Sequence, residues 1–194
     1  MSSATPGRSI VLVGLMGTGK SSVARLLGEN LGIDVLDTDR MVETDTGRKV
    51  REIFVEDGEE VFRELESRQL HSCLARNEPC VIAAAGGVVL SRVNRDALNT
   101  ARREGRVFVV WLTADVEQLI ARTTRGGHRP LLDDDPSATL RSMATSRENL
   151  YEAVSDVSIC TADLSIAQVA TVIIDLEARG RIESGSCDDH GKSV

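Results

Sequence analysis

Short apolar runs alternate along this chain with segments that have helical periodicity. The runs are four to six residues long, at 10–13, 33–36, 80–85, 107–112 and 157–160. This length is typical of buried strands, and the segments between them carry apolar residues at spacings of three and four, as amphipathic helices do. Five buried strands alternating with helices favour an α/β fold with a mainly parallel sheet covered on both faces.

The helical segments are unevenly distributed between the predicted strands. Three of them fall between the second and third strands and form an insertion of helices. A stretch at 125–136 interrupts every periodicity with Gly-Gly, two prolines and three successive aspartates, which predicts a mobile loop. The predicted helices lie at 22–30, 40–46, 50–55, 59–74, 92–104, 115–124, 137–153 and 166–178.

The first strand leads directly into the sequence Gly14-Leu15-Met16-Gly17-Thr18-Gly19-Lys20-Ser21, which matches the phosphate-loop pattern G-x-x-x-x-G-K-[ST]. Glycines allow successive N–H groups to point inwards, and the following helix adds the partial positive charge of its N-terminus. Lys20 is expected to reach the outer phosphates of a nucleotide, and the Ser21 hydroxyl to ligate the accompanying Mg²⁺. The expected nucleotide-binding residues of the loop are Gly17, Thr18, Gly19, Lys20, Ser21 and Ser22.

Length and composition favour a single domain with one buried core. The chain has 194 residues, 41% of them hydrophobic, and a formal net charge of -7. We therefore expect one domain over 8–178 with flexible termini at 1–7 and 179–194. The acidic balance opposes nucleic acid and anionic membranes as partners, and no apolar stretch approaches the length of a membrane span. With no signal peptide and no metal-ligand spacing among the four cysteines, we expect a cytoplasmic protein, monomeric by default.

Two carboxylates follow the second predicted strand. Asp37 and Asp39 are two residues apart, so both side chains are expected to leave the strand on one side and face the phosphate loop. One would lie near Mg²⁺, and the other would accept a hydrogen bond from a substrate hydroxyl. The alternative for one of them is to cap the helix that begins near Arg40. Asp115 also follows a strand, but it directly precedes a helical pattern and is better explained as a cap, which leaves Asp37 as the expected metal ligand.

Further motifs resemble the shikimate kinase family over roughly residues 9–174. Their order and spacing, as well as their identity, agree with that family. They are the loop form Gly-x-Met-Gly-x-Gly-Lys-Ser, Asp37-Thr38-Asp39, Thr46-Gly47, Ile53-Phe54, Asp57-Gly58-Glu59, Phe62-Arg63, Gly86-Gly87, Arg129-Pro130-Leu131-Leu132, and Arg147 before Leu150-Tyr151.

The resemblance implies a fold and a reaction. The fold would be the three-layer P-loop kinase fold, similar to nucleoside monophosphate kinases, with a five-stranded parallel sheet flanked by helices. A helical substrate-binding insertion would lie at about 38–76 and a lid at about 122–136. The reaction would be transfer of the γ-phosphoryl group of ATP, with Mg²⁺, to the 3-hydroxyl of shikimate in aromatic amino acid biosynthesis.

The same resemblance implies roles for individual residues. Lys20, Asp39 and Arg129 would be catalytic, Asp37 and Ser21 would lie at the metal, Arg122 would pack on adenine, and Arg129 would enter with the lid to touch the phosphates. Planar guanidinium groups bind carboxylates in a bidentate way, which suits the single carboxylate of shikimate. The residues that would hold shikimate are Asp39, Arg63, Gly86, Gly87 and Arg147, with Phe54, Phe62 and Glu66 shaping or supporting the pocket.

The sequence departs from the family pattern beside the third strand. The family usually has three glycines there, preceded by a stretch with Ser or Thr, whereas this chain reads Ala83-Ala84-Ala85-Gly86-Gly87. The added methyl group matters only if Ala85 needs a positive φ or touches the substrate. The missing hydroxyl would leave one magnesium-bound water less supported.

Two alternatives to a shikimate kinase stay open on the sequence. The first is a related kinase for another hydroxy acid, such as gluconate, or for a nucleoside monophosphate. The pair of arginines with Asp39 favours a carboxylated polyol over a nucleobase, which would need a flat stacking slot. The second is a non-catalytic nucleotide-binding regulator derived from this fold, an interpretation kept open by Ala83, Ala84 and Ala85.

Overall fold

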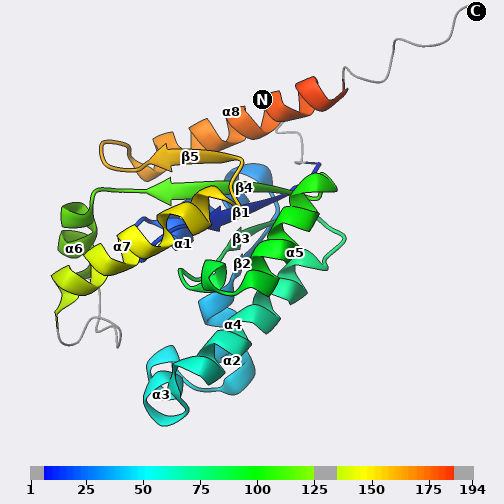
Figure 1. Ribbon diagram of the computed structural model, residues 1–194. Helices are drawn as coiled ribbons and strands as arrows, with labels where there is room; N and C mark the ends of the chain where they lie inside the picture. Colours follow the sequence, from blue (N-terminus) through cyan, green and yellow to red (C-terminus); the bar gives the residue numbers. More distant parts are fainter. Residues whose placement is uncertain (1–6, 125–134, 186–194) are drawn as a thin grey trace, which may run out of the picture.

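A five-stranded sheet with the strand order β2-β3-β1-β4-β5 forms the centre of the molecule. Figure 1 shows it in the computed structural model, which describes residues 7–124 and 135–185. Every pair of neighbouring strands is parallel, so each connection crosses over through helices and all the carboxyl ends meet at one edge. The predicted parallel α/β sheet is confirmed. Its strands are β1 Ser9–Val13, β2 Asp34–Asp37, β3 Cys80–Ala83, β4 Val107–Thr113 and β5 Val157–Cys160.

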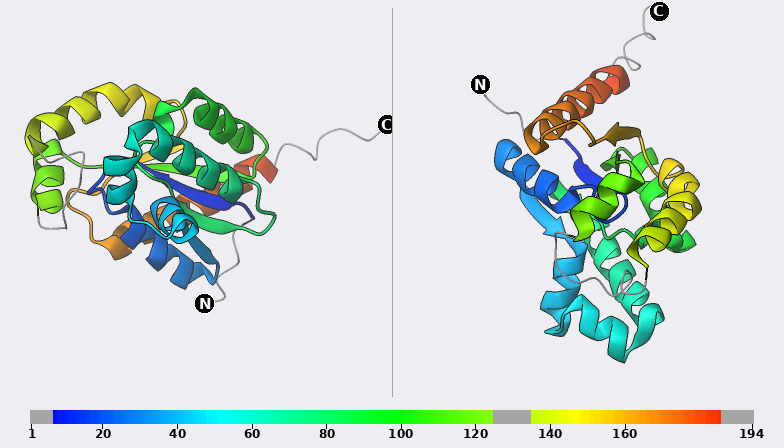
Figure 2. Two further views of the ribbon diagram at one scale, coloured as in Figure 1. Left: turned by 90° about the horizontal axis from the view of Figure 1, so that it is seen from below. Right: turned by 90° about the vertical axis from the view of Figure 1, so that its left-hand side faces the viewer.

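Helices cover both faces of this sheet (Figure 2). Helices α1 (Lys20–Leu31) and α8 (Ile166–Gly185) pack on one face, where Ile10 and Leu12 of β1 join their apolar cluster. Val11 and Val13 point to the opposite face, because successive side chains of a strand alternate. The helices that contribute to the cluster on that face are α4 (Gly58–Leu74), α5 (Arg92–Arg103), α6 (Val116–Thr124) and α7 (Pro136–Glu152).

The helices between β2 and β3 project from the sheet as an insertion (Figure 1). They are α2 (Thr38–Thr46), α3 (Val50–Glu56) and the first half of α4. Val42, Ile53 and Phe62 form a small apolar cluster of their own there, and the second half of α4 returns to the sheet through Leu70 and Leu74. The insertion therefore has its own packing and is joined to the sheet through α4 and through α2, which follows β2 directly.

Several element boundaries lie one to a few residues from their predicted positions, and the structure adds one short helix. Helix α2 begins at Thr38 rather than at residue 40, which places Asp39 in a helix. Helix α8 continues to Gly185, beyond its predicted end at residue 178. A short 3₁₀ helix, η1 (Val88–Leu90), was not predicted, because three residues carry no periodicity.

Part of the sequence prediction falls outside the described residues. The mobile loop predicted at 125–136 lies there except for Asp135, which caps α7, and Pro136, which begins it. Arg129 and most of the expected lid also lie outside. Among the described residues, no helix is both long enough and apolar enough to cross a membrane.

Candidate active site

The phosphate loop connects β1 to α1 at the carboxyl edge of the sheet. Gly14, Gly17 and Gly19 adopt φ values of 139°, 84° and 92°, which L residues rarely adopt. A Cβ atom at Gly14 would also overlap the carbonyl oxygen of Leu112 on β4. The glycines are therefore required by the backbone path of the loop, as the motif predicted.

Two polar side chains of the phosphate loop, Lys20 and Thr18, differ in whether they face the cavity or the interior of the loop. Lys20 Nζ donates hydrogen bonds to the carbonyl oxygens of Gly14 and Leu15, at 2.8 and 2.9 Å, which holds the ammonium group across the loop. Thr18, by contrast, is buried, and its hydroxyl donates to the Leu15 oxygen at 2.8 Å. The Thr18 side chain thus stabilises the loop itself, and Lys20 faces the cavity beside it.

Asp37, the last residue of β2, combines the two roles that the sequence left open. Its Oδ2 accepts a hydrogen bond from the Ser21 hydroxyl at 2.7 Å, and its Oδ1 accepts one from the Arg40 N–H at 3.4 Å. It therefore caps α2 and also faces the phosphate loop. A serine hydroxyl and a carboxylate in contact are hard oxygen donors of the kind that Mg²⁺ prefers.

Asp39 reaches the site by a route that strand periodicity did not predict. It lies in the first turn of α2, so the expectation that Asp37 and Asp39 leave a strand on one side is wrong. Both aspartates nevertheless line the same cavity, because α2 starts directly at the end of β2. The first turn of α2, rather than the two-residue repeat of a strand, brings the two carboxylates together.

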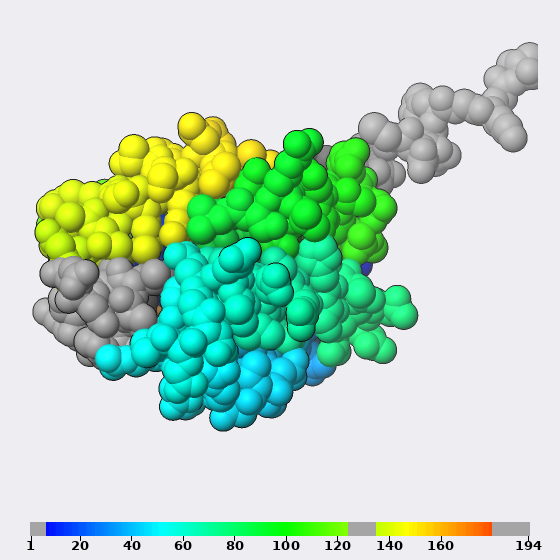
Figure 3. All heavy atoms as spheres, turned by 60° about the horizontal axis from the view of Figure 1, so that its bottom comes forward, coloured from blue at the N-terminus to red at the C-terminus, as the bar shows by residue number. Residues whose placement is uncertain are grey.

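The cavity at this edge has a volume of about 510 Å³. It opens between the phosphate loop, the insertion and α7. Figure 3 shows the insertion (cyan) next to α7 (yellow) on the surface of the molecule. Every described residue predicted to hold the acceptor lines it, together with Ala83 and Ala84. Besides Ala83 and Ala84, the lining residues are Met16, Gly17, Gly19, Lys20, Ser21, Ser22, Asp37, Asp39, Val50, Phe54, Phe62, Arg63, Glu66, Gly86, Gly87, Arg122 and Arg147.

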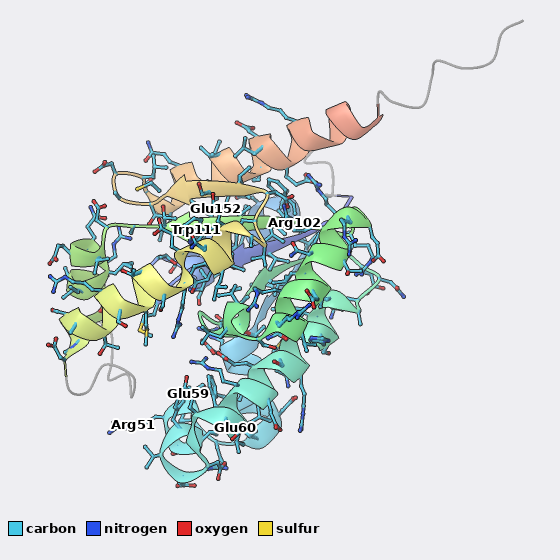
Figure 4. The ribbon with its side chains drawn as sticks, in the orientation of Figure 1. Arg51, Glu59, Glu60, Arg102, Trp111 and Glu152 are labelled. Atoms are coloured by element: carbon cyan, nitrogen blue, oxygen red, sulfur yellow. The ribbon has the colours of Figure 1, made fainter. Side chains whose placement is uncertain are left out.

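Arg63 is held at this cavity by two carboxylates of its own helix. It donates to Glu66 at 2.6 Å and to Glu59, which Figure 4 labels on α4, at 2.8 Å. Burial raises the pKa of Glu66 to about 7, although the guanidinium of Arg63 pulls it down. The guanidinium also packs directly on Gly87, where a Cβ atom would overlap it.

Arg147, which belongs to α7, also lines the cavity. It is only 7% exposed, and its Nη1 donates to the Gly86 carbonyl at 3.3 Å. Tyr151, one helical turn further along, donates its hydroxyl to the same oxygen at 2.6 Å. The Tyr151 ring stacks on Trp111 of β4, which Figure 4 labels beside α7. Arg63 and Arg147 thus approach the Gly86-Gly87 segment from two elements.

A second cavity of about 280 Å³ lies on the other side of the phosphate loop. Arg122 lines both cavities and is anchored by hydrogen bonds to the hydroxyl and the carbonyl oxygen of Thr161, both at 3.1 Å. Val23, Leu164 and Val169 supply an apolar lining. The expected packing of Arg122 on adenine stays a prediction.

Ala85 does not need the freedom of a glycine. No residue other than glycine has a positive φ in the described part of the chain. Its side chain is buried in the core rather than lining the cavity, and its N–H donates to the hydroxyl of Thr38 at 2.9 Å. The substitution of the first glycine is therefore compatible with the backbone at this point.

Sequence reasoning missed Thr38 and Tyr151. Both are buried residues whose hydroxyl groups bind the backbone between β3 and η1. Their partners lie 47 and 65 residues away, a separation that no local pattern reports. Burial of a polar side chain becomes visible only in the folded chain.

The family model for shikimate kinase matches residues 16–177, most of the chain. The chain belongs to the shikimate kinase family. It is 46% identical over 176 residues to a shikimate kinase of Symbiobacterium thermophilum, with 89% of this chain and 98% of the relative covered. A shikimate kinase of Vibrio vulnificus is 39% identical over 170 residues, covering 87% and 95%.

Solved structures agree with this membership. The structure of shikimate kinase from Acinetobacter baumannii in complex with shikimate matches at a TM-score of 0.82 and 34% identity, covering 96% of this chain and 97% of that one. A gluconokinase from Sinorhizobium meliloti, at a TM-score of 0.57 and 22% identity, shares the fold alone. This member of the shikimate kinase family is thus a phosphotransferase with an alcohol acceptor and ATP as its donor.

Proposed function

We propose that the chain phosphorylates the 3-hydroxyl of shikimate with ATP, a step in aromatic amino acid biosynthesis. The observation that carries the proposal is the shared cavity of Arg63, Arg147 and Asp39 beside the phosphate loop. Two cations and one carboxylate suit a ligand with one carboxylate and several hydroxyls. A cytoplasmic location and a monomeric state remain predictions.

Acceptor binding would depend on both sides of the cavity. The guanidinium groups of Arg63 and Arg147 would take the substrate carboxylate, with backbone groups of Gly86 and Gly87 between them. Asp39 would accept a hydrogen bond from a ring hydroxyl and orient it toward the outermost phosphate. Positioning of this kind supplies most of what a loose phosphoryl-transfer transition state requires.

Donor binding would use the phosphate loop and Arg122. Phosphate oxygens would replace the two carbonyl oxygens that now accept from Lys20, because an anion attracts the ammonium group more strongly. The backbone N–H groups from Gly17 to Ser22 would hold the same phosphates at the N-terminus of α1. Arg122 would pack on adenine, and Arg129, outside the described residues, would touch the phosphates.

Ser21 and Asp37 fit a magnesium site, since their side-chain oxygens already lie 2.7 Å apart next to the loop. The ion would neutralise phosphate charge when bound with ATP. Asp37 would hold its carboxylate in place through the cap on α2, and Ser21 would turn its hydroxyl oxygen from Asp37 to the metal. Neither Ala83 nor Ala84 carries a hydroxyl that would bind a magnesium-bound water there.

A coupled assay of ADP release with shikimate, gluconate and AMP as separate acceptors tests the proposal. We expect release with shikimate only, and Lys20→Ala should abolish it. ADP release with gluconate or AMP instead of shikimate would identify that compound as the acceptor. No ADP release with any of the three would favour the non-catalytic regulator.

Arginine variants test the acceptor site itself. Arg63→Ala and Arg147→Ala should each lower kcat/KM for shikimate by roughly a hundredfold or more, because a desolvated carboxylate would lose a charged partner. Arg102→Ala is the matched control: Arg102 is also paired, with Asp156 at 3.0 Å, and its side chain is 23% exposed against 20% for Arg63. Full activity of both site variants would refute the assignment.

A further inference from the structure

The short hydrogen bond between Tyr151 and Gly86 joins α7 to the segment after β3. Tyr151 is 1% exposed, and its hydroxyl donates to the Gly86 carbonyl oxygen at 2.6 Å. Burial raises the pKa of Tyr151 to about 12, so the hydroxyl keeps its proton and remains a donor at neutral pH. The contact is a permanent link between two elements that both line the acceptor cavity.

The Gly86 carbonyl has a second donor in Arg147. Arg147 Nη1 lies 3.3 Å from the oxygen, against 2.6 Å for the Tyr151 hydroxyl. The two side chains are four residues apart on α7 and therefore lie on the same face of the helix. Tyr151 makes the shorter hydrogen bond to this oxygen, and Arg147 donates to it through Nη1 alone. The other N–H groups of the Arg147 guanidinium can therefore donate to a ligand.

The other side of this peptide faces Arg63. The guanidinium of Arg63 packs against the α-carbon of Gly87 so closely that a side chain there would overlap it. In a trans peptide the C=O and the N–H point in opposite directions, so a bond that fixes the Gly86 carbonyl also fixes the Gly87 N–H. The Gly86-Gly87 peptide is therefore in contact with both arginines.

We propose that Tyr151 is a positioning residue for the acceptor: its hydroxyl holds the Gly86-Gly87 peptide, and through it the spacing of Arg63 and Arg147 around the substrate carboxylate. The inference rests on the proposed function of this cavity. Tyr151 does not line the cavity and acts through the residues that do.

The ring and the hydroxyl of Tyr151 can be separated by substitution. The ring is held by Trp111, with centroids 5.8 Å apart and planes inclined by 21°. Tyr151→Phe keeps this contact and removes only the oxygen. In the variant, Arg147 is the donor left to the Gly86 carbonyl among the described contacts, so it is drawn toward the peptide and away from a ligand.

The expected result is a selective loss of acceptor affinity. Loss of one buried hydrogen bond corresponds to about a tenfold rise in the KM for shikimate in Tyr151→Phe, while the KM for ATP should stay within about twofold. Calorimetric titration with shikimate should give the same loss in Kd. Reversible unfolding would raise the apparent Kd tenfold only if about 90% of the free variant were unfolded, which its thermal unfolding curve would show.

Ser9→Ala is the matched control. The Ser9 hydroxyl is also buried and also bridges two distant segments, since it accepts from the Cys80 N–H at 3.1 Å. It lies at the amino ends of β1 and β3, opposite the cavity. We expect Ser9→Ala to lower Tm without changing either KM.

A Tyr151→Phe enzyme with the wild-type KM and Kd for shikimate, altered only in Tm, would overturn the positioning role and leave the proposed function intact. Equal rises in KM for shikimate and ATP would also overturn it, because a general loosening of the site would explain them. Absence of shikimate turnover in the wild-type enzyme would refute the proposed function, and this inference with it.

Discussion

At the scale of single residues, the acceptor cavity is organised by side chains that support Arg63. Glu66 is 2% exposed and Glu59 is exposed, and together they hold the guanidinium from two directions. Charge-assisted hydrogen bonds of this kind align a planar guanidinium better than a flexible surface position would. Burial of Glu66 opposes this arrangement, because removing the charged carboxylate from water costs free energy.

Glu66→Gln should change how stability depends on pH. Since the pKa of Glu66 is raised from 4.5 to about 7, the folded chain holds a proton in this window that the unfolded chain releases. The free energy of unfolding of the wild type should therefore fall as the pH rises from 4.5 to 7, by about 2 kcal/mol relative to Glu66→Gln.

Urea unfolding at several pH values in this window measures the difference. Glu60→Gln, an exposed change on the same helix, is the control and should follow the wild type. Parallel curves for the wild type and Glu66→Gln would contradict the assignment of the raised pKa to Glu66.

Ala85→Gly restores the glycine of the family pattern and should not improve the enzyme. Ala85 has an ordinary φ and packs in the core, so glycine adds only backbone freedom to the unfolded chain and removes a buried methyl group. We expect a loss of about 1 kcal/mol in the free energy of unfolding and an unchanged KM for shikimate. A clear fall in KM would instead mean that the alanine obstructs the acceptor.

At the scale of elements, the site is assembled from the segments that follow three neighbouring strands. The phosphate loop follows β1, Asp37 and α2 follow β2, and the Gly86-Gly87 segment follows β3. Thr38 joins the second of these segments to the third through the Ala85 N–H. Parallel strands make this convergence unavoidable, and the cross-connections determine its precise geometry.

Gly87→Ala should separate acceptor binding from stability. Gly87 has a φ of -91°, which alanine adopts without strain, and the atoms that a Cβ would meet are those of the Arg63 guanidinium. Because that group is the flexible end of a side chain, it would move aside, with a small change in Tm. The KM for shikimate should rise about tenfold or more while the KM for ATP is unchanged.

Thermal unfolding and steady-state kinetics of Gly87→Ala measure both effects on one preparation. A large fall in Tm with unchanged KM values would show that the glycine serves the fold rather than the position of Arg63.

At the scale of the whole molecule, the described residues form three apolar clusters that stabilise different parts of the structure. One cluster lies on each face of the sheet, and a third, built on Val42, Ile53 and Phe62, lies inside the insertion. The third cluster supports α3 and α4, which bring Phe54 and Arg63 to the cavity. Packing of the insertion is therefore expected to affect the acceptor more than the nucleotide.

Ile53→Ala and Ile173→Ala form a matched pair for this idea. Both isoleucines are 0% exposed, one in the insertion and one in α8 against the sheet. Each change should cost about 2–5 kcal/mol of local or global stability, because it leaves a cavity. Ile53→Ala should raise the KM for shikimate several-fold, whereas Ile173→Ala should lower Tm and leave that KM unchanged. Equal effects of the two variants on the KM would contradict separate packing of the insertion.

The sequence by itself determined the parallel sheet, the phosphate loop and the set of residues around it. Apolar runs of strand length, separated by helical periodicity, leave little choice of architecture, and the loop motif requires a particular backbone path. The convergence of the phosphate loop, Asp37 and Gly86-Gly87 on one edge followed from the same parallel order, whereas Arg63 and Arg147 were placed there only by the family resemblance. These features depend on local sequence patterns and on a topological rule for parallel sheets, and both can be inferred from the amino-acid sequence.

Only the tertiary structure decided how these residues are held. The entry of Asp39 into the first turn of α2 followed from where a helix starts, and element boundaries depend on competing caps. The bond from Tyr151 to Gly86 and the packing of Arg63 on Gly87 join residues 65 and 24 positions apart. Such contacts arise when helices settle on a sheet, because burial makes each polar group find a partner that no local pattern specifies.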